Sequence, residues 1–319
     1  MSTEPRTLTE AIIHFADPDV ALKTTVDLRW PSGVTCPTCG RADVRFIATR
    51  RVWECKGKHS RKQFSCKVGT IFEDSPLGLD KWFSAIWMIA NCKNGVSSYE
   101  IHRGIGVTQK SAWFMLHRIR LAMETGSFLK SGGEFEADET FIGGLSRNMS
   151  KSRRERTITG TGGMGKEVVA GVLRRSTETE ASRVTAKHVP NTKRRTIEPG
   201  IRAVAEKGAT VYTDALRSYA RLDGDYIHHV IDHAVEYVRG AVHTNGMENF
   251  WSLFKRALKG TYVSVEPMHL DAYVVEQTFR FNERKGMGGT RFRKVLGNVT
   301  GKRVTYKELI GHGAASAPA

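Results

Sequence analysis

Apolar residues along the chain recur mostly at helical spacing, and short stretches of extended character lie between the helical ones. Segments 82–90, 112–123, 247–258 and 270–281 place large apolar side chains three or four residues apart, which predicts helices with one buried face. Another helix is expected at about 192–207. Extended stretches are expected at 42–48, 50–55, 134–142, 168–173, 181–189 and 209–214. Strands and helices that alternate in this way predict an α/β domain in the second half of the chain.

The strand expected at 134–142 is rich in carboxylates, and Asp138 stands in its middle. Carboxylates are disfavoured inside strands because a buried charge is expensive without a partner. Asp138 is therefore predicted to be a metal ligand, although an edge strand with a solvated acidic face would explain the same pattern. Asp214 ends the strand expected at 209–214 and is a second isolated carboxylate.

A third carboxylate lies in the first turn of a helix expected to start near Asn245, a residue type favoured at the N-cap. Glu248 shares a helix face with Lys255 and Lys259, so a metal-binding carboxylate would stand in line with two cations that contact phosphates. The alternative for Glu248 is structural, because the helix dipole favours a glutamate in the first turn.

The cysteines of the N-terminal region have the spacing of a metal site. Cys36 and Cys39 form a Cys-x-x-Cys-Gly turn, which directs two thiolates toward one ion. Cys55 and His59 are predicted to complete a structural Zn²⁺ site, and Cys66 is the competing fourth ligand. A regular zinc ribbon would have a cysteine at position 58, where this chain has a lysine, so a ribbon that has lost its metal is the alternative.

Two helices are expected on either side of a turn at 104–106. The second presents Gln109 and Lys110 in its exposed first turn and carries Arg118 and Arg120 further along. Such a helix presents polar tips to a major groove and cations to phosphates, although many ordinary helical hairpins look the same. With a basic ribbon directly upstream, we favour a helix-turn-helix that binds DNA.

The charge balance favours an anionic partner. The 319 residues carry a net charge of +16 and the sequence pI is about 9.8, and nucleic acid is the commonest partner of such a chain. Hydrophobic residues make up 40% of the chain, which supports sizeable cores, and no apolar run is long enough to span a bilayer. Five cysteines without a secretion signal suit a reducing cytoplasm. Residues 145–166 are polar, basic and glycine-rich, and we expect a mobile loop there.

Taken in order, these motifs resemble the zinc-ribbon DDE transposases of bacterial insertion sequences, the ISXO-like group, over roughly residues 8–310. The matching segments are Cys36-x-x-Cys39, 61–65 with 69–72, 108–120, 138–140 with Gly143-Gly144, 212–214, and 243–245 through 255–256. The combination is specific, whereas each segment alone is not.

The resemblance implies an RNase H-like (DDE integrase-type) domain and a DNA transposase, a polynucleotidyl transferase that cleaves and joins DNA at element ends. Asp138 and Asp214 match the first two family carboxylates. Glu248 is preferred to Asn245 as the third, because a charged ligand binds a hard cation more strongly than an amide does. Two Mg²⁺ (or Mn²⁺) ions, about 3.5–4 Å apart, are expected between the three carboxylates. His243 is a further candidate near the scissile phosphate.

The expected organisation is multidomain. It comprises a helical lead-in (1–30), a zinc ribbon (31–74), a helix-turn-helix segment (75–128), the RNase H-like domain (129–285), and a basic C-terminal segment with a disordered tail (286–319). The expected partners are double-stranded DNA, as terminal inverted repeats and target, and further copies of the chain in a dimeric or larger synaptic complex. No membrane is expected, and the location would be the bacterial cytoplasm, at the nucleoid. Two rivals stay open: a non-catalytic DNA-binding regulator derived from a transposase, and an RNase H-type nuclease without strand transfer.

Overall fold

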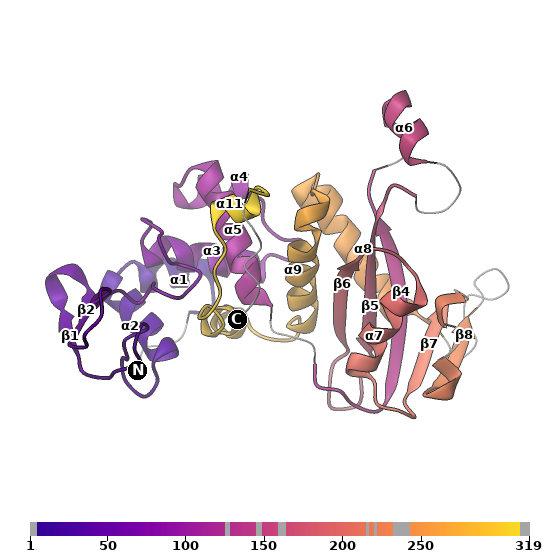
Figure 1. The fold of residues 1–319 in the computed structure, drawn as a ribbon, viewed down its shortest axis with the longest axis horizontal. Helices are drawn as coiled ribbons and strands as arrows, with labels where there is room; N and C mark the ends of the chain where they lie inside the picture. The colour runs from indigo at the N-terminus through magenta and orange to yellow at the C-terminus, as the bar shows by residue number, and fades with distance from the viewer. Residues whose placement is uncertain are drawn as a thin grey trace. The chain divides into compact units, whose positions relative to one another are not determined.

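The structure is a computed structural model that describes residues 5–124, 128–144, 149–158, 164–214, 217–219, 222–231 and 243–312. The chain divides into two compact units, one formed by Met1–Thr125 with Gly286–Ala319 and the other by Gly126–Lys285. The second unit is thus inserted, in sequence, between the two parts of the first, as the colours of Figure 1 show. The tail expected to be disordered lies largely outside the described residues, as does the glycine-rich part of the 145–166 segment.

A small antiparallel ribbon forms one part of the first unit. Helices α1 (Leu8–Phe15) and α2 (Pro18–Arg29) precede strands β1 (Val44–Ile47), β2 (Val52–Cys55) and β3 (Gln63–Phe64). The strands pair in the order β1-β2-β3, so the two strands expected from alternation at 42–48 and 50–55 are both present. The buried side chains of the ribbon are Cys36, Trp53, Cys55, Phe64 and Cys66. Three of these five side chains are cysteines, which makes the ribbon a small fold that depends on cysteine chemistry.

Helices form the rest of the first unit: α3 (Leu79–Asn91), α4 (Ser98–Ile105), α5 (Gln109–Met123), α10 (Gly288–Gly297) and α11 (Tyr306–Leu309). Ser97 closes a capping box with Glu100 at the start of α4, and Gly106 ends that helix at φ +65°, a conformation that glycine adopts without strain. Thr108 then caps α5, because its side chain accepts from the amide of Ser111. The two expected helices are both present, but α4 continues through Ile105, so the turn begins at Gly106 and not at the expected position 104.

The basic C-terminal segment contributes to the core of the first unit. Phe292 of α10 is buried against the rings of Phe15, Phe83 and Trp87. The amide of Ile71 donates to the carbonyl of Val299 at 3.0 Å. Because residues from both ends of the chain share one core, the first unit is complete only when the segment after residue 285 is present.

A five-stranded mixed sheet organises the second unit (Figure 1). Its order is β6 (Arg183–Val189), β5 (Glu167–Arg174), β4 (Glu134–Ile142), β7 (Thr210–Asp214) and β8 (Ile227–Ile231). The pairs β4·β5 and β5·β6 are antiparallel, whereas β4·β7 and β7·β8 are parallel. Ala137 pairs with Thr213 across β4 and β7, so the next residues, Asp138 in the middle of β4 and Asp214 at the carboxyl end of β7, lie side by side on two parallel strands.

Helices cover both faces of this sheet. Helix α7 (Arg194–Val204) packs on the face that carries Phe135, Ala137 and Val211. Helices α8 (Asn245–Ala257) and α9 (Leu270–Asn282) pack on the face that carries Val169 and Leu173. Helix α8 continues into a π-helical turn, Leu258–Tyr262, and the short 3₁₀ helices are Ala48–Arg50, Arg217–Tyr219, Leu222–Gly224 and Pro267–His269. Side chains alternate between faces along a strand, so Asp138 points to the α8 side and Glu139 to the α7 side.

The expectation of an irregular loop throughout 145–166 is wrong for its middle, where α6 (Lys151–Thr157) forms a short helix. The segment has no hydrophobic period, and periodicity therefore gave no signal. Arginine, lysine and glutamate are nonetheless good helix formers, so a short helix can form there without an apolar stripe. In the described part of the chain, no helix is both long and apolar enough to cross a bilayer.

Candidate functional site

The acidic residues singled out from the sequence come together in the second unit, where β7 ends beside the middle of β4. We call this place the acidic edge of the sheet. Asp138 and Asp214 are neighbours on parallel strands, and both are partly buried. Glu248 is exposed in the first turn of α8, the helix that crosses this face of the sheet. The structure thus brings residues 138, 214 and 248 to one region, although more than thirty residues separate each from the next in sequence.

An open pocket of about 590 Å³ lies over this edge. Asp138 and Glu248 line it together with the cationic side chains of α8 and the turn after it. The full lining is Asp138, Glu139, Thr140, Glu248, Trp251, Ser252, Lys255, Arg256 and Lys259. The face of α8 predicted from its spacing is therefore one wall of the pocket. Acidic groups on β4 and at the start of α8, together with cations further along α8, suit a DNA phosphate that binds with metal ions.

Negatively charged groups lie close to one another at this edge. Burial, and after it the negative charges of Asp214 and Glu248, raise the pKa of Asp138 to about 6 against the opposing hydrogen bond from Trp251. Burial lowers the pKa of Lys255, and the negative charge of Asp138 acts in the opposite direction. Carboxylates that disfavour one another's ionisation in this way would be stabilised by a bound cation.

Glu139 is a further carboxylate of the pocket, which the sequence analysis did not select. Its Oε2 accepts a hydrogen bond from the hydroxyl of Tyr219 at 2.8 Å. Burial raises the pKa of Glu139 to about 7, and the charges of Asp214 and Asp138 contribute, while the Tyr219 bond opposes the shift. The only sequence signal for Glu139 was its position beside Asp138.

A glycine on the sheet allows α8 to approach the acidic edge closely. Gly171 of β5 pairs with Asp138, and a Cβ there would come within 2.6 Å of Met247 Cε and 3.0 Å of the Trp251 ring. The indole Nε1 of Trp251 consequently reaches Asp138 and donates to its Oδ2 at 3.0 Å. Trp251 was predicted only as a core residue, and it also fixes the carboxylate of Asp138.

His243 and Asn245, the other candidates, lie at the start of α8. Nδ1 of His243 is 3.2 Å from Nη2 of Arg175 and 3.6 Å from a carboxylate oxygen of Glu136. Asn245 is exposed as the first helical residue, and Thr244, not Asn245, occupies the N-cap position. Neither His243 nor Asn245 is among the residues that line the pocket.

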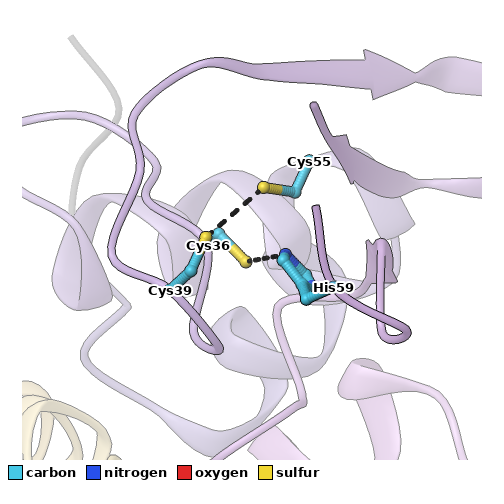
Figure 2. A group of neighbouring side chains, drawn as sticks. All are labelled: Cys36, Cys39, Cys55 and His59. Carbon is cyan, nitrogen blue, oxygen red and sulfur yellow. Dashed lines mark hydrogen bonds between the residues drawn. The ribbon is translucent and has the colours of Figure 1, made fainter. Parts of the chain in front are cut away.

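The cysteine site lies in the first unit. Figure 2 shows Cys36, Cys39, Cys55 and His59 facing one another from the turn after α2, the end of β2 and the loop that follows it. Their ligand atoms all lie within 4.8 Å of one another. The sulfur of Cys36 is 3.5 Å from Nε2 of His59, and the sulfurs of Cys39 and Cys55 are 3.6 Å apart. Three thiols and an imidazole in this arrangement are a donor set for tetrahedral Zn²⁺.

Local geometry around the four ligands supports this assignment. Gly57 lies between them, and a Cβ there would come within 3.3 Å of Cys55 Sγ and 3.4 Å of Cys39 Sγ. Cys66 is not part of the group, so the alternative fourth ligand is not supported. The backbone carbonyl of Cys66 accepts a hydrogen bond from Arg29. Its thiol is buried, and burial raises the pKa of Cys66 to about 11. A thiol that resists ionisation in this way is an inert core side chain.

Two of the cations predicted to contact DNA from α5 are buried instead. Arg118 is 3% exposed and Arg120 is 1% exposed. The guanidinium of Arg118 donates to the backbone carbonyls of Ile71 and Val304, so it joins segments of the first unit. The prediction that Arg118 and Arg120 are exposed phosphate contacts is therefore wrong, because the C-terminal segment covers that part of α5.

The remaining predicted DNA contacts are accessible to different degrees. Lys110 is exposed, with its ammonium 4.5 Å from the centre of the Tyr306 ring. Gln109 is half-buried and donates to Ser98 of α4 at 2.9 Å, which ties the two helices together. Lys255 is half-buried and Lys259 is exposed, and both line the acidic pocket.

Comparison with known proteins bears on both units. A model described as an ISXO2-like transposase domain matches residues 130–282, and one described as a transposase zinc-ribbon domain matches residues 17–67. The chain is 28% identical over 250 residues to an uncharacterized protein in transposable element ISH50 of Halobacterium salinarum. The aligned region covers 75% of this chain and 82% of that protein.

It is 35% identical over 95 residues to an uncharacterized transposase-like protein of Haemophilus influenzae, covering 30% of this chain and 76% of that protein. No solved structure is significantly similar to the chain. A transposase model over the sheet unit, a zinc-ribbon model over the cysteine site and relatives from transposable elements agree with one another. The chain therefore belongs to the family of zinc-ribbon transposases with an ISXO2-like transposase domain.

Proposed function

We propose that this protein is a DDE transposase that cleaves DNA at the ends of an insertion sequence and joins those ends to target DNA. Asp138, Asp214 and Glu248 would be its catalytic carboxylates, on a domain of RNase H-like fold. The order of three antiparallel strands, a helix and then a parallel strand tipped by Asp214 supports that fold assignment.

One observation carries the proposal: two aspartates end up side by side on parallel strands, with α8 adding Glu248 across a shared pocket. The strand register makes the first two neighbours, and burial, followed by the negative charges of Asp214 and Glu248, raises the pKa of Asp138. Carboxylates placed for ordinary surface solvation would not be grouped on a partly buried edge at this cost.

The residues of the pocket divide the work between metal and DNA. Oxygen ligands of this kind suit Mg²⁺ or Mn²⁺, which when bound would activate the attacking oxygen and neutralise charge at the scissile phosphate. Trp251 holds the carboxylate of Asp138 in one orientation. Lys255, Arg256 and Lys259 line the same pocket and would bind the DNA backbone on either side of that phosphate.

We assign DNA-end recognition to the first unit. The ribbon with its zinc site and the pair α4 and α5, acting as a helix-turn-helix, would bind terminal inverted repeats. Lys110 at the exposed start of α5 is positioned for such contacts. A synaptic complex that joins two element ends would need at least two copies of the chain, with target DNA bound in the second unit.

The test is cleavage of DNA that carries the element ends, with Mg²⁺, by the full-length zinc-loaded protein and by Asp138→Asn and Asp214→Asn. We expect each substitution to lower the cleavage rate by at least about 100-fold, because loss of a ligand should exceed loss of a ligand's outer partner. Affinity for end DNA should change little. Lys23→Ala, an exposed lysine of α2 paired with Asp27, serves as the control that should cleave normally.

Each rival function has its own outcome in the same assay. Metal-independent binding without any nicking by the wild-type protein would identify a DNA-binding regulator. Cleavage without joining to target, and without preference for element ends, would identify an RNase H-type nuclease. Full cleavage by either Asn variant would reject the assignment of the acidic site.

A further inference from the structure

A buried acid–base cluster lies beside the acidic pocket, on the same strand as Asp138. Glu136 is 1% exposed and precedes Asp138 by two residues, so both side chains point to the α8 side of the sheet. Oε1 of Glu136 accepts from Nε of Arg175 at 2.8 Å, and Oε2 accepts from the backbone N–H of Met247 at 2.9 Å. A strand residue thus provides an acceptor for the first turn of α8.

The start of α8 depends on this acceptor because it lacks a local one. Thr244 occupies the N-cap position but makes no side-chain hydrogen bond there. The first amides of a helix have no intrahelical partner, and a negative charge at that end is also favoured by the helix dipole. Glu136 supplies both the acceptor and the charge from a residue 111 positions earlier.

Arg175 holds Glu136 in place and joins it to neighbouring strands. Its guanidinium donates to Oε2 of Glu134 at 3.2 Å and to the carbonyl of His243 at 2.5 Å. It also lies 3.9 Å from the centre of the Tyr212 ring on β7. A buried carboxylate needs such a partner, and a planar guanidinium can bind several acceptors in one fixed geometry.

The helix meets β4 at two points. The Met247 amide binds Glu136, and one turn later the Trp251 indole binds Asp138. Glu248 directly follows the first of these points. Gly246 makes the approach possible, because a Cβ there would come within 2.8 Å of Glu136 Oε2 and 3.0 Å of Leu173 Cδ1.

We propose that Glu136 and Arg175 are positioning residues that fix Glu248 opposite Asp138 and thereby set the affinity of the acidic site for divalent cations. Neither residue lines the pocket, so they act through α8 and not on the DNA or the metal. The proposal rests on the proposed function, since it concerns the same carboxylates. It also gives His243 a role, because the carbonyl of His243 is what Arg175 binds at the entrance to α8.

The test compares the full-length zinc-loaded wild type with Glu136→Gln. Mn²⁺ binding is measured by electron paramagnetic resonance, and end cleavage is measured as a function of Mg²⁺ concentration. We expect the Mn²⁺ dissociation constant and the half-saturating Mg²⁺ concentration to rise by about 10- to 100-fold. The cleavage rate at saturating metal should change much less. The Met247 amide should exchange faster with solvent, because its acceptor has weakened.

A second variant and a matched control separate positioning from general loosening. Gly246→Ala changes no charge but displaces the start of α8, so it should raise the metal requirement in the same direction. Glu276→Gln removes another fully buried acid of the same unit, paired with Arg280 on α9, and should leave metal affinity unchanged.

Wild-type metal affinity in both Glu136→Gln and Gly246→Ala would overturn the positioning proposal. So would an equal loss of affinity in Glu276→Gln. Failure of the proposed function looks different: wild type and Asp138→Asn would bind Mn²⁺ equally, and neither would nick DNA.

Discussion

The two candidate metal sites of this chain are built in opposite ways. In the ribbon, ligand atoms of Cys36, Cys39, Cys55 and His59 already lie within 4.8 Å of one another. The carboxylates of the sheet edge come from separate elements and face an open pocket. In the part of the chain that the structure describes, no set of three or more carboxylates has its oxygen atoms as close together as the ligand atoms of the four ribbon residues. Thiolate and imidazole ligands that are already gathered in one group suit a permanently bound structural ion. Carboxylate ligands on separate elements suit ions that bind together with a substrate.

The difference shows what each unit does with its polar side chains. In the first unit the ribbon ligands face one another, and the buried guanidinium of Arg118 is satisfied by backbone carbonyls. In the second unit, like charges are held together at one edge, which destabilises the fold locally and makes that edge ready to bind cations. Four predictions follow from this contrast, ordered by expected effect.

Removal of a ribbon ligand should have the largest effect. Structural zinc in small domains contributes roughly 10–16 kcal/mol of apparent binding free energy, most of which is folding free energy. Cys36→Ala should therefore lose the bound Zn²⁺ and unfold the ribbon. Zinc content per chain and proteolysis within residues 31–74 measure this. Cys66→Ala is the control and should retain one zinc, and a Cys36→Ala protein with full zinc would contradict the closed-site interpretation.

Replacement of the third acidic ligand should come next. Glu248 lines the pocket and its charge acts on Asp138, whereas Asn245 is exposed one turn earlier. We expect Glu248→Gln to lower end cleavage by at least about 100-fold and Asn245→Ala to lower it by less than about tenfold. The measurement is single-turnover cleavage at saturating Mg²⁺. The reverse ranking would assign the third position to Asn245.

Neutralisation of Asp138 should stabilise the second unit in the absence of Mg²⁺. Its pKa is about 6 in the fold against an ordinary 3.8, so the native state binds the proton more tightly than the unfolded state does. The contribution of Asp138 to stability is then greatest below pH 4 and is lost as pH rises through 6. At about 1.4 kcal/mol for each pKa unit, the loss is at most about 3 kcal/mol, and Asn avoids it.

The measurement for this prediction is the urea midpoint of β4 peptides by pulsed hydrogen exchange, at pH 7.5 and at pH 4. Asp138→Asn should raise the midpoint at pH 7.5, and the difference should vanish at pH 4. A variant less stable than wild type at pH 7.5 would show that the acidic edge is not a strained site.

The smallest effect should separate exposed from buried cations of α5. Lys110→Ala removes an exposed charge and should reduce the slope of log K against log salt by about 0.9 if one phosphate contact is lost. Arg118→Met should destabilise the first unit and leave that slope unchanged, because the guanidinium is turned toward Val304 and Ile71. A salt titration of end-DNA binding measures both. A reduced slope for a folded Arg118→Met protein would restore the original prediction for Arg118.

Sequence reasoning succeeded where spacing itself is the physical constraint. The ribbon ligands could be predicted from the Cys-x-x-Cys turn at Cys36 and Cys39. The residues on the pocket-lining face of α8 could be predicted because side chains three or four residues apart lie on the same side of a helix. The strand that carries Asp138 and the strand that ends in Asp214 were also located, and the adjacency of the two aspartates then needed only the register of β4 with β7.

It failed where the outcome depends on contacts with distant segments. Arg118 has the composition of a DNA contact, and its burial results from the arrival of residues near Val304. Glu136 looked like one more carboxylate of an acidic strand, and only the start of α8 and Arg175 make it a buried partner. The helix α6 lacks any apolar period, so hydrophobic periodicity could not reveal it.

The inserted arrangement of the two units has a consequence for how the protein is made. A ribosome translates the whole sheet unit, ending at Lys285, before it translates Phe292 and Val299, which complete the core of the other unit. The sheet unit is therefore contiguous in sequence, whereas the first unit lacks α10 and α11 until the chain is nearly complete. A nascent chain stalled or truncated after residue 285 would thus expose apolar surface around Phe83 and Trp87, and would be a target for chaperones and proteases before it could bind DNA.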